Sequence, residues 1–369
     1  MSTATSQIRE ASLVKRIADA VLYEGYILYP YRPSAVKNQQ RWNFGVLCPE
    51  SYAIAQRGTE SSKMRTECLI EADPSTTINL RIRFLQLMMR EVAEVIKECG
   101  RPFPDCEHVL KHEQEHFVLT PSLEVDGTRL QKWQEAVERE VVVPEMSISE
   151  AKQRIRFEFP ANRTLEEVKS ASGTVIGLIA RTQHDLSGEI EISINQTNRQ
   201  SRQRGIGNQK LLRLSITVRN LAIFEDAATR TRDEALMQSL VSTHTVLETQ
   251  NGAFVSLLDP PEEYKELASD CKNTGTYPVL VGEEGDRHCV LSSPIILYDY
   301  PQIAPQSAGN LFDGTEIDEI LSLRIMSLTD DEKREMRNAD ELARQLLERT
   351  DSMSPEQMMN LHGVMTRKS

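Results

Sequence analysis

Apolar and polar residues alternate in many short stretches of this chain. A period of two is typical of strands with one buried face. Gly, Asn, Ser and Pro separate the stretches, as turns require. The pattern predicts strands at residues 26–31, 42–47, 65–72, 77–85, 129–146, 155–159, 175–180, 190–194, 211–218, 253–258 and 279–281. Strands and helices do not alternate regularly, so we expect an α+β fold whose mainly antiparallel β body is sandwich-like or barrel-like.

Helical periodicity predicts peripheral helices around this body. Residues 8–24 place apolar side chains on one face and stop before Gly25, which suits a helix end. The period also becomes helical in LQLMMREVAEVIKEC, residues 85–99. Shorter helices are predicted at 232–241 and 265–271.

The stretch from Val290 to Leu328 predicts where the β body ends. Residues 295–300 are β-branched and aromatic, which predicts a buried strand. Pro294 and Pro301 bracket that run. After it, Asp313 can cap a helix whose apolar residues share one face.

The tail continues as helix. Thr329 to Glu332 form a capping-box pattern, and Pro355 opens a last helix. The predicted organisation is an N-terminal α/β-mixed lobe at 1–128, an antiparallel β-rich lobe at 129–312 and a helical tail at 313–369.

Charge and composition narrow the class of protein. The 369 residues contain 43 Lys and Arg against 55 Asp and Glu, a net charge of −12. This balance argues against nucleic-acid binding, which depends on neutralising phosphates. No run of about 18 apolar residues predicts a membrane span. The N-terminus lacks the blocks of a secretory signal, and the six cysteines form no CxxC pair, so we expect a cytoplasmic protein with reduced thiols.

The densest group of candidate metal ligands is Cys106, His108, His112 and His116. On a helix the three histidines would lie on one face, where an adjacent pair can bind one ion. Imidazole with thiolate or carboxylate suits zinc or nickel. The alternative is a solvated polar segment with no cofactor, and spacing alone does not separate the two.

Two further groups are candidates for binding another protein. Aromatic and basic residues surround the predicted hairpin near the N-terminus, and aromatic and Arg side chains are favoured in interface centres. Methionines mark the last helix, and thioethers adapt to irregular surfaces. Packing within the protein explains both groups as well. The candidate residues are Tyr29, Tyr31, Arg32, Arg41, Trp42, Met358, Met359 and Met365.

The basic segment 199–210, RQSRQRGIGNQK, has the composition of an anion-binding loop but neither the Walker spacing nor a third dinucleotide-site glycine. We interpret it as a hairpin loop between the strands at 190–194 and 211–218. No GxSxG or kinase pattern is present in the chain. A catalytic role is therefore less favoured than a binding role and stays open.

Several strings resemble an uncharacterised bacterial protein family. They are VSLLDPP at 255–261, YPVLVG at 277–282, LSSPIILYDYPQIAP at 291–305, LFDGTEIDEILSLRIMSLTDDEKREMR at 311–337 and YPYRPSAVKNQQRWNFGVLCP at 29–49. Members of that family are encoded in gene clusters of uptake nickel–iron hydrogenases. The resemblance implies a cytoplasmic accessory protein that contacts hydrogenase subunits or maturation proteins. The alternatives are a nickel- or zinc-handling protein or enzyme that uses the Cys106–His116 cluster, and a general interaction module unrelated to hydrogenase.

Overall fold

The computed structural model describes residues 14–19, 21–22, 44–96, 109–112, 115–150, 152–197 and 210–302, and in the tail 325, 328–337, 344, 347–348 and 351–352. Antiparallel strands dominate this part of the chain, and its helices are few and short. The predicted α+β class with a mainly antiparallel body is confirmed.

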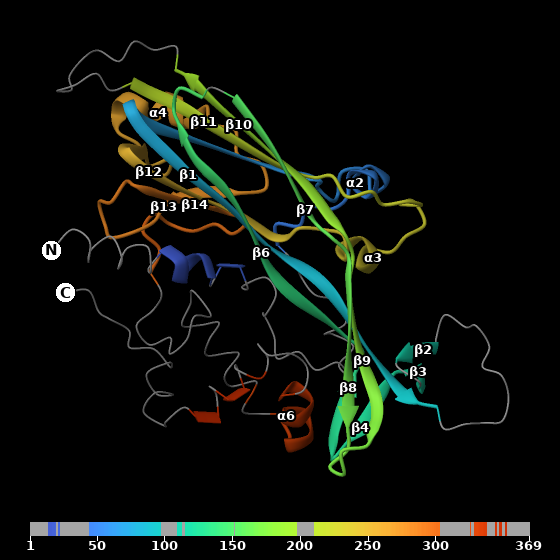
Figure 1. Ribbon diagram of the computed structural model, residues 1–369. Coiled ribbons are helices and arrows are strands. Elements are labelled where there is room, and N and C mark those ends of the chain that lie inside the picture. The colour runs from blue at the N-terminus through green and yellow to red at the C-terminus, as the bar shows by residue number, and fades with distance from the viewer. Residues whose placement is uncertain are drawn as a thin grey trace.

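One strand organises the sheet. β1 (Lys63–Val95) has 33 residues, and at about 3.3 Å per residue it extends for about 110 Å. Figure 1 shows it running the length of the molecule. Five strands pair with it. β12 (Val241–Val255) and β9 (Val175–Gln183) follow one another along one edge, while β11 (Lys210–Asn220), β6 (Trp133–Ser147) and β3 (Glu115–Thr120) follow one another along the other.

The predicted turn between residues 72 and 77 is wrong, because β1 runs through it. Opposite β12, Ala72 pairs with Gly252 and Thr77 with Gln250, so β1 holds extra residues there as a bulge. Asp73 Oδ1 accepts the Ser75 N–H at 2.7 Å. The turn chemistry of Asp-Pro-Ser therefore bends a strand locally without ending it.

The predicted helix at 85–99 is also wrong in its described part, since residues 85–95 belong to β1. Met89 and Arg90 pair with both β6 and β9. Backbone hydrogen bonds from both neighbours outweigh the weak helical preference of this segment.

The remaining strands extend the sheet. Its path runs β13–β14–β12–β1–β11–β10–β7, with two ends, and β8 joins through β9. β10 and β11 pair antiparallel, which confirms the predicted hairpin on either side of the basic loop. The other bounds are β2 Val109–His112, β4 Ser122–Val125, β5 Thr128–Gln131, β7 Lys152–Phe159, β8 Asn162–Lys169, β10 Leu186–Gln196, β13 Tyr277–Leu280 and β14 Cys289–Ser293.

The predicted buried strand at 295–300 is wrong. The strand of this region is β14, which ends just before Pro294, because proline cannot donate to a ladder. Ile296 and Tyr298 are mostly exposed, while Leu297 is buried. The segment bends at both ends, Tyr300 has φ +56°, and the Tyr300 N–H bonds to Leu280 O at 2.8 Å.

The N-terminal helix packs on one face of the sheet, beside β13 and β14 (Figure 1). The helical residues 14–19 and 21–22, here the N-terminal helical segment, bury Val14, Ile17 and Val21 against β12, β13 and β14. In the tail, α6 (Asp330–Arg337) begins at the predicted capping box, where Thr329 N–H bonds to Glu332 at 2.7 Å. The other helices are α2 Glu50–Ala55, α3 Arg232–Leu236, α4 Lys265–Ser269 and the 3₁₀ turn η2 Glu262–Tyr264.

Within the described residues, no helix is long and apolar enough to span a membrane. In the predicted strand 42–47, the described residues 44–47 form an isolated bridge at Leu47 but no ladder. The strand at 26–31, the helix after Asp313 up to Ile320 and the helix opened by Pro355 lie outside the described residues.

The main core lies on the other face of β1. Ile78, Leu80 and Ile82 point into it, and strands β7, β10 and β11 curl over them with apolar residues of their own. Phe84 of β1 contacts Phe157 and Phe159 of β7 at ring-centroid distances of 5.9 and 5.8 Å. The aromatic contact holds the end of the curled sheet onto β1.

We expect Leu80→Ala to lower the free energy of unfolding by about 2–5 kcal/mol, because a fully buried side chain would leave a cavity. Urea unfolding measures the change. Val142→Ala is the control: its side chain is 62% exposed, so the expected loss is within about 0.5 kcal/mol. Equal losses would contradict a core built on this face of β1.

Candidate functional site

The candidate metal ligands His112 and His116 lie on the β2–β3 hairpin, not on a helix. His112 pairs with Glu115, and Lys111 pairs with His116. Paired residues share a face and neighbours alternate, so the two histidines point to opposite faces. His112 Nε2 lies 3.6 Å from Glu167 Oε1.

Cys106 and His108 lie outside the described residues. Among the described ones, no three His, Cys, Asp or Glu side chains converge as a metal site would require. A zinc or nickel site that includes Cys106 or His108 stays a prediction. The candidate partner-binding residues of the N-terminal hairpin, Tyr29 to Trp42, and of the last helix, Met358 to Met365, also lie outside the described part.

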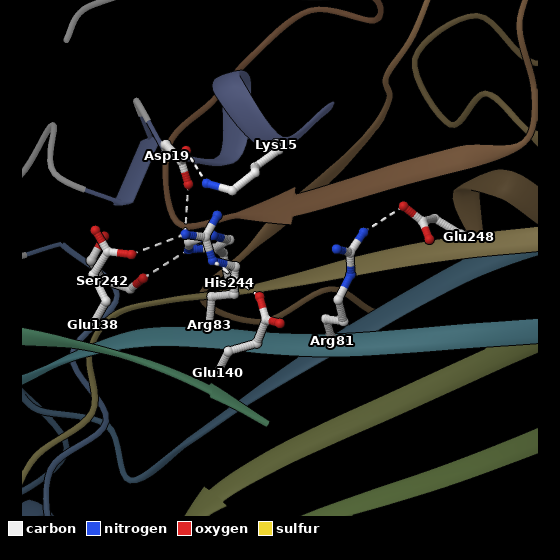
Figure 2. A network of polar contacts seen from close by, with 9 residues as sticks. All are labelled: Lys15, Asp19, Arg81, Arg83, Glu138, Glu140, Ser242, His244 and Glu248. Carbon is white, nitrogen blue, oxygen red and sulfur yellow. Dashed lines mark hydrogen bonds and ion pairs between the residues drawn. The ribbon is translucent and has the colours of Figure 1, made fainter. Parts of the chain in front are cut away.

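A buried polar row crosses the helix-covered face of the sheet. Arg83 of β1 pairs in register with Glu140 of β6 on one side and His244 of β12 on the other. Arg83 and His244 are both buried. Figure 2 shows their side chains rising toward the N-terminal helical segment.

Three carboxylates surround the Arg83 guanidinium. Asp19 of the N-terminal helical segment accepts from Nη2 at 2.6 Å, and Glu138 lies 3.3 Å from the same nitrogen. Glu140 lies 3.5 Å from Nε. Asp19 is mostly buried, whereas the two glutamates of β6 are half exposed. The ion pair with Asp19 therefore ties the helical segment to β1, and the cluster is most exposed to solvent along β6.

His244 is neutral in this environment. Its Nδ1 lies 3.0 Å from the Ser242 carbonyl, which can only accept, so Nδ1 carries the proton. Nε2 is buried and has no hydrogen-bond partner among the described residues. Burial lowers the pKa of His244 to about 4, and the Arg83 charge acts in the same direction.

The backbone beside His244 is strained. Ser242 has φ +54°, which non-glycine residues rarely adopt. Its N–H bonds to Phe44 O at 3.0 Å, and its Oγ lies 3.4 Å from Val21 O. Ser242 thus joins β12 to the N-terminal helical segment and to residue 44. Together with Asp19 and Arg83, it makes this cluster a clamp between helix and sheet, which we call the Arg83 clamp.

A second candidate site is the gap between β6 and β7. The two strands follow one another in the chain, yet in the described residues β6 pairs with β1 and β7 with β10, and no ladder joins them. Four apolar side chains at this gap are only partly buried against the main core. They are Val141, Ile148, Ile155 and Phe159, and together they define the β6–β7 seam.

Cations line the outer face of β7 next to the seam. Lys152, Arg154 and Arg156 are exposed by 65, 57 and 74% of their side chains. They alternate with the inward Ile155 and Phe157. Glu189 and Glu191 of β10 neutralise part of this charge at distances of 3.1–3.8 Å. The inner side of this strand edge is therefore apolar, and its outer side carries three partly neutralised cations followed by the exposed Glu158.

The two candidate sites differ in how far the sequence reveals them. The alternation of cations and apolar residues in KQRIRFEF is readable at 152–159, although the sequence analysis assigned it no role. Arg83 and His244 are 161 positions apart in the chain. Only the pairing of β1 with β12 brings them together.

No protein-family model matches this chain, and no curated protein matches it.

Neutral His244 predicts a pH-dependent stability. The pKa of His244 is about 4 in the folded protein and about 6.5 in the unfolded chain. Between pH 6.5 and 4 the unfolded chain therefore binds one more proton than the folded protein, and the free energy of unfolding falls as the pH falls. We expect a loss of up to about 3 kcal/mol from pH 6.5 to 4, at about 1.4 kcal/mol per unit. His244→Gln should flatten that part of the curve of unfolding free energy against pH.

His288→Gln is the control for this measurement, since it removes an exposed imidazole from the same sheet region. The buried neutral state of His244 is contradicted if wild type and His244→Gln lose stability in parallel between pH 6.5 and 4.

A double-mutant cycle tests the Arg83 clamp. Asp19→Asn and Arg83→Gln should each lower the free energy of unfolding by about 1–3 kcal/mol, with a coupling of about 1–2 kcal/mol, because the pair is shielded from water. Lys15→Ala breaks the exposed Lys15–Asp19 pair instead and should cost no more than about 0.5 kcal/mol. Strict additivity of Asp19→Asn and Arg83→Gln would rule out the clamp.

Proposed function

We propose that this protein is a non-catalytic, cytoplasmic accessory protein that acts through contacts with other proteins. The observation that carries this proposal is the β6–β7 seam: partly buried apolar core residues lie beside a strand edge with no ladder partner among the described residues. Sheet edges with exposed backbone groups and neighbouring apolar side chains bind extended segments of other proteins.

The resemblance to proteins of nickel–iron hydrogenase clusters supplies the context. We propose hydrogenase subunits or maturation proteins as the partners. The Arg83 clamp fits the same role, since it fixes the N-terminal helical segment to the sheet with a mostly buried ion pair. A rigid body is a better binding platform than a mobile one, because less conformational entropy is lost on association.

Affinity purification from the native host, grown under hydrogenase-expressing conditions, tests the proposal. We expect hydrogenase subunits or maturation proteins to co-purify with the tagged wild-type chain. Replacing Lys152 and Arg156 by alanine should lower their recovery several-fold, because both side chains are exposed at the seam. Replacing exposed Arg163 and Lys169 of β8 together is the matched control, with the same loss of two positive charges away from β7.

Wild-type purification that enriches neither hydrogenase subunits nor maturation proteins would contradict the hydrogenase context. Equal recovery with all variants would place the contact elsewhere on the protein.

A further inference from the structure

The geometry points to β7 as the docking edge for an extended partner segment that alternates acidic and apolar residues. This inference rests on the proposed protein-binding function and adds the chemistry of the segment that binds. It commits to a strand of another protein, added antiparallel or parallel to β7, with carboxylates on the outer face and apolar side chains toward the seam.

The direction of the backbone groups supports an open edge. Leu221 N–H donates to Ser187 O at 2.9 Å, so Ser187 uses its backbone groups toward β11. The backbone N–H and C=O groups of successive residues point to opposite edges of a strand. Gly188 and Ile190 therefore point these groups toward their partners Phe157 and Ile155 of β7. The N–H and C=O of Arg154 and Arg156 then face the other way, to the free edge. An added strand would bond to these groups.

The side chains specify the pattern. Lys152, Arg154 and Arg156 recur at every second residue on the outer face, about 7 Å apart along the strand. An added strand presents its own alternate side chains at the same spacing, so carboxylates there would face the cations. Its remaining residues would cover Ile155 and the part of Phe159 that Arg139 of β6, 4.8 Å from the ring centroid, leaves exposed. Apolar residues at these positions would complete the core.

The shape of β7 keeps this edge in place without a partner. Gly188 lies opposite Phe157, and a Cβ on that glycine would come within 2.2 Å of the ring. The ring therefore lies across the glycine and meets Phe84 of β1. Because β7 is anchored from its inner face, its outer edge can bind a strand without being displaced.

Binding of synthetic peptides to the purified full-length chain tests the inference. The probe is a fluorescein-labelled seven-residue peptide that alternates glutamate and valine, followed by fluorescence anisotropy. A peptide of the same composition with the glutamates and valines in two blocks controls for charge. A lysine–valine peptide controls for apolar strand pairing. We expect the alternating acidic peptide to bind at least about tenfold more tightly than either control.

Two variants at one position separate charge from backbone pairing. Arg154→Ala removes a cation but keeps the N–H, and should weaken binding about two- to fivefold. Arg154→Pro also removes the edge N–H, which an edge strand tolerates, and should weaken binding at least about tenfold. Thermal unfolding checks that each variant folds. Arg163→Ala, on exposed β8, should bind as wild type does.

Amide hydrogen exchange identifies the occupant. We expect the N–H groups of Arg154 and Arg156 to exchange rapidly in the free chain and slowly with the acidic peptide bound. Slow exchange in the free chain at all concentrations means that the chain covers its own edge, and concentration-dependent protection means that a second copy does. Either result overturns the inference, as does equal binding of the three peptides.

The peptide and purification experiments fail independently. Peptide binding without recovery of hydrogenase proteins supports the docking edge and contradicts the hydrogenase context. Recovery of those proteins without peptide binding supports the proposed function and places its contact away from β7.

Discussion

Hydrogen bonding along both edges of β1 is the constraint on which the rest of the structure depends. Residues 77–85 pair with β12 on one edge and with β6 on the other, and residues 89–90 pair with β6 and β9. When the backbone N–H and C=O groups of a strand are hydrogen-bonded along both edges, few of them are left without a partner. Such a strand can run through the middle of a large sheet. Everything packed on the sheet takes its position from this strand.

The two faces of β1 differ in chemistry around Arg83. One face is apolar, and strands β7, β10 and β11 curl over it to form the main core. The other carries Arg83 between Glu140 and His244 and is covered by the N-terminal helical segment. Burying a charge is costly unless it is paired, and Asp19 on the helical segment supplies the pair. The polar face thus specifies where that segment docks, which an apolar face alone would do less selectively.

The curl of the sheet also brings one of its edges over the main core. β7 lies at the end of the strand path, and the aromatic contact of Phe157 and Phe159 with Phe84 keeps it over the core. Cations on an edge strand disfavour pairing with another copy of the same strand, because like charges would face each other. The same cations favour an acidic strand, so protection against self-association and selectivity for a partner have a common physical origin.

The sequence predicts those elements whose interactions join residues close together in the chain. Local patterns were sufficient for the short strands β7, β9, β10 and β11, for α4 and for the capping box before α6, because alternation and capping act within a few residues. They failed at residues 73–76 and 85–95, where a turn signal and a helical period are overridden by neighbouring strands. They failed again at 295–300, where proline ends β14 early.

The candidate sites divide in the same way. The alternation of cations and apolar residues in β7 is a property of the sequence by itself. Whether its edge is open depends on which strands pair, and the Arg83 clamp depends on residues from four distant segments, Asp19, Arg83, Glu138 with Glu140, and His244. Periodicity determines which side of a strand is buried. Only the tertiary structure decides which strands become neighbours, because that choice is made by long-range hydrogen bonding and burial, which leave no local pattern in the chain.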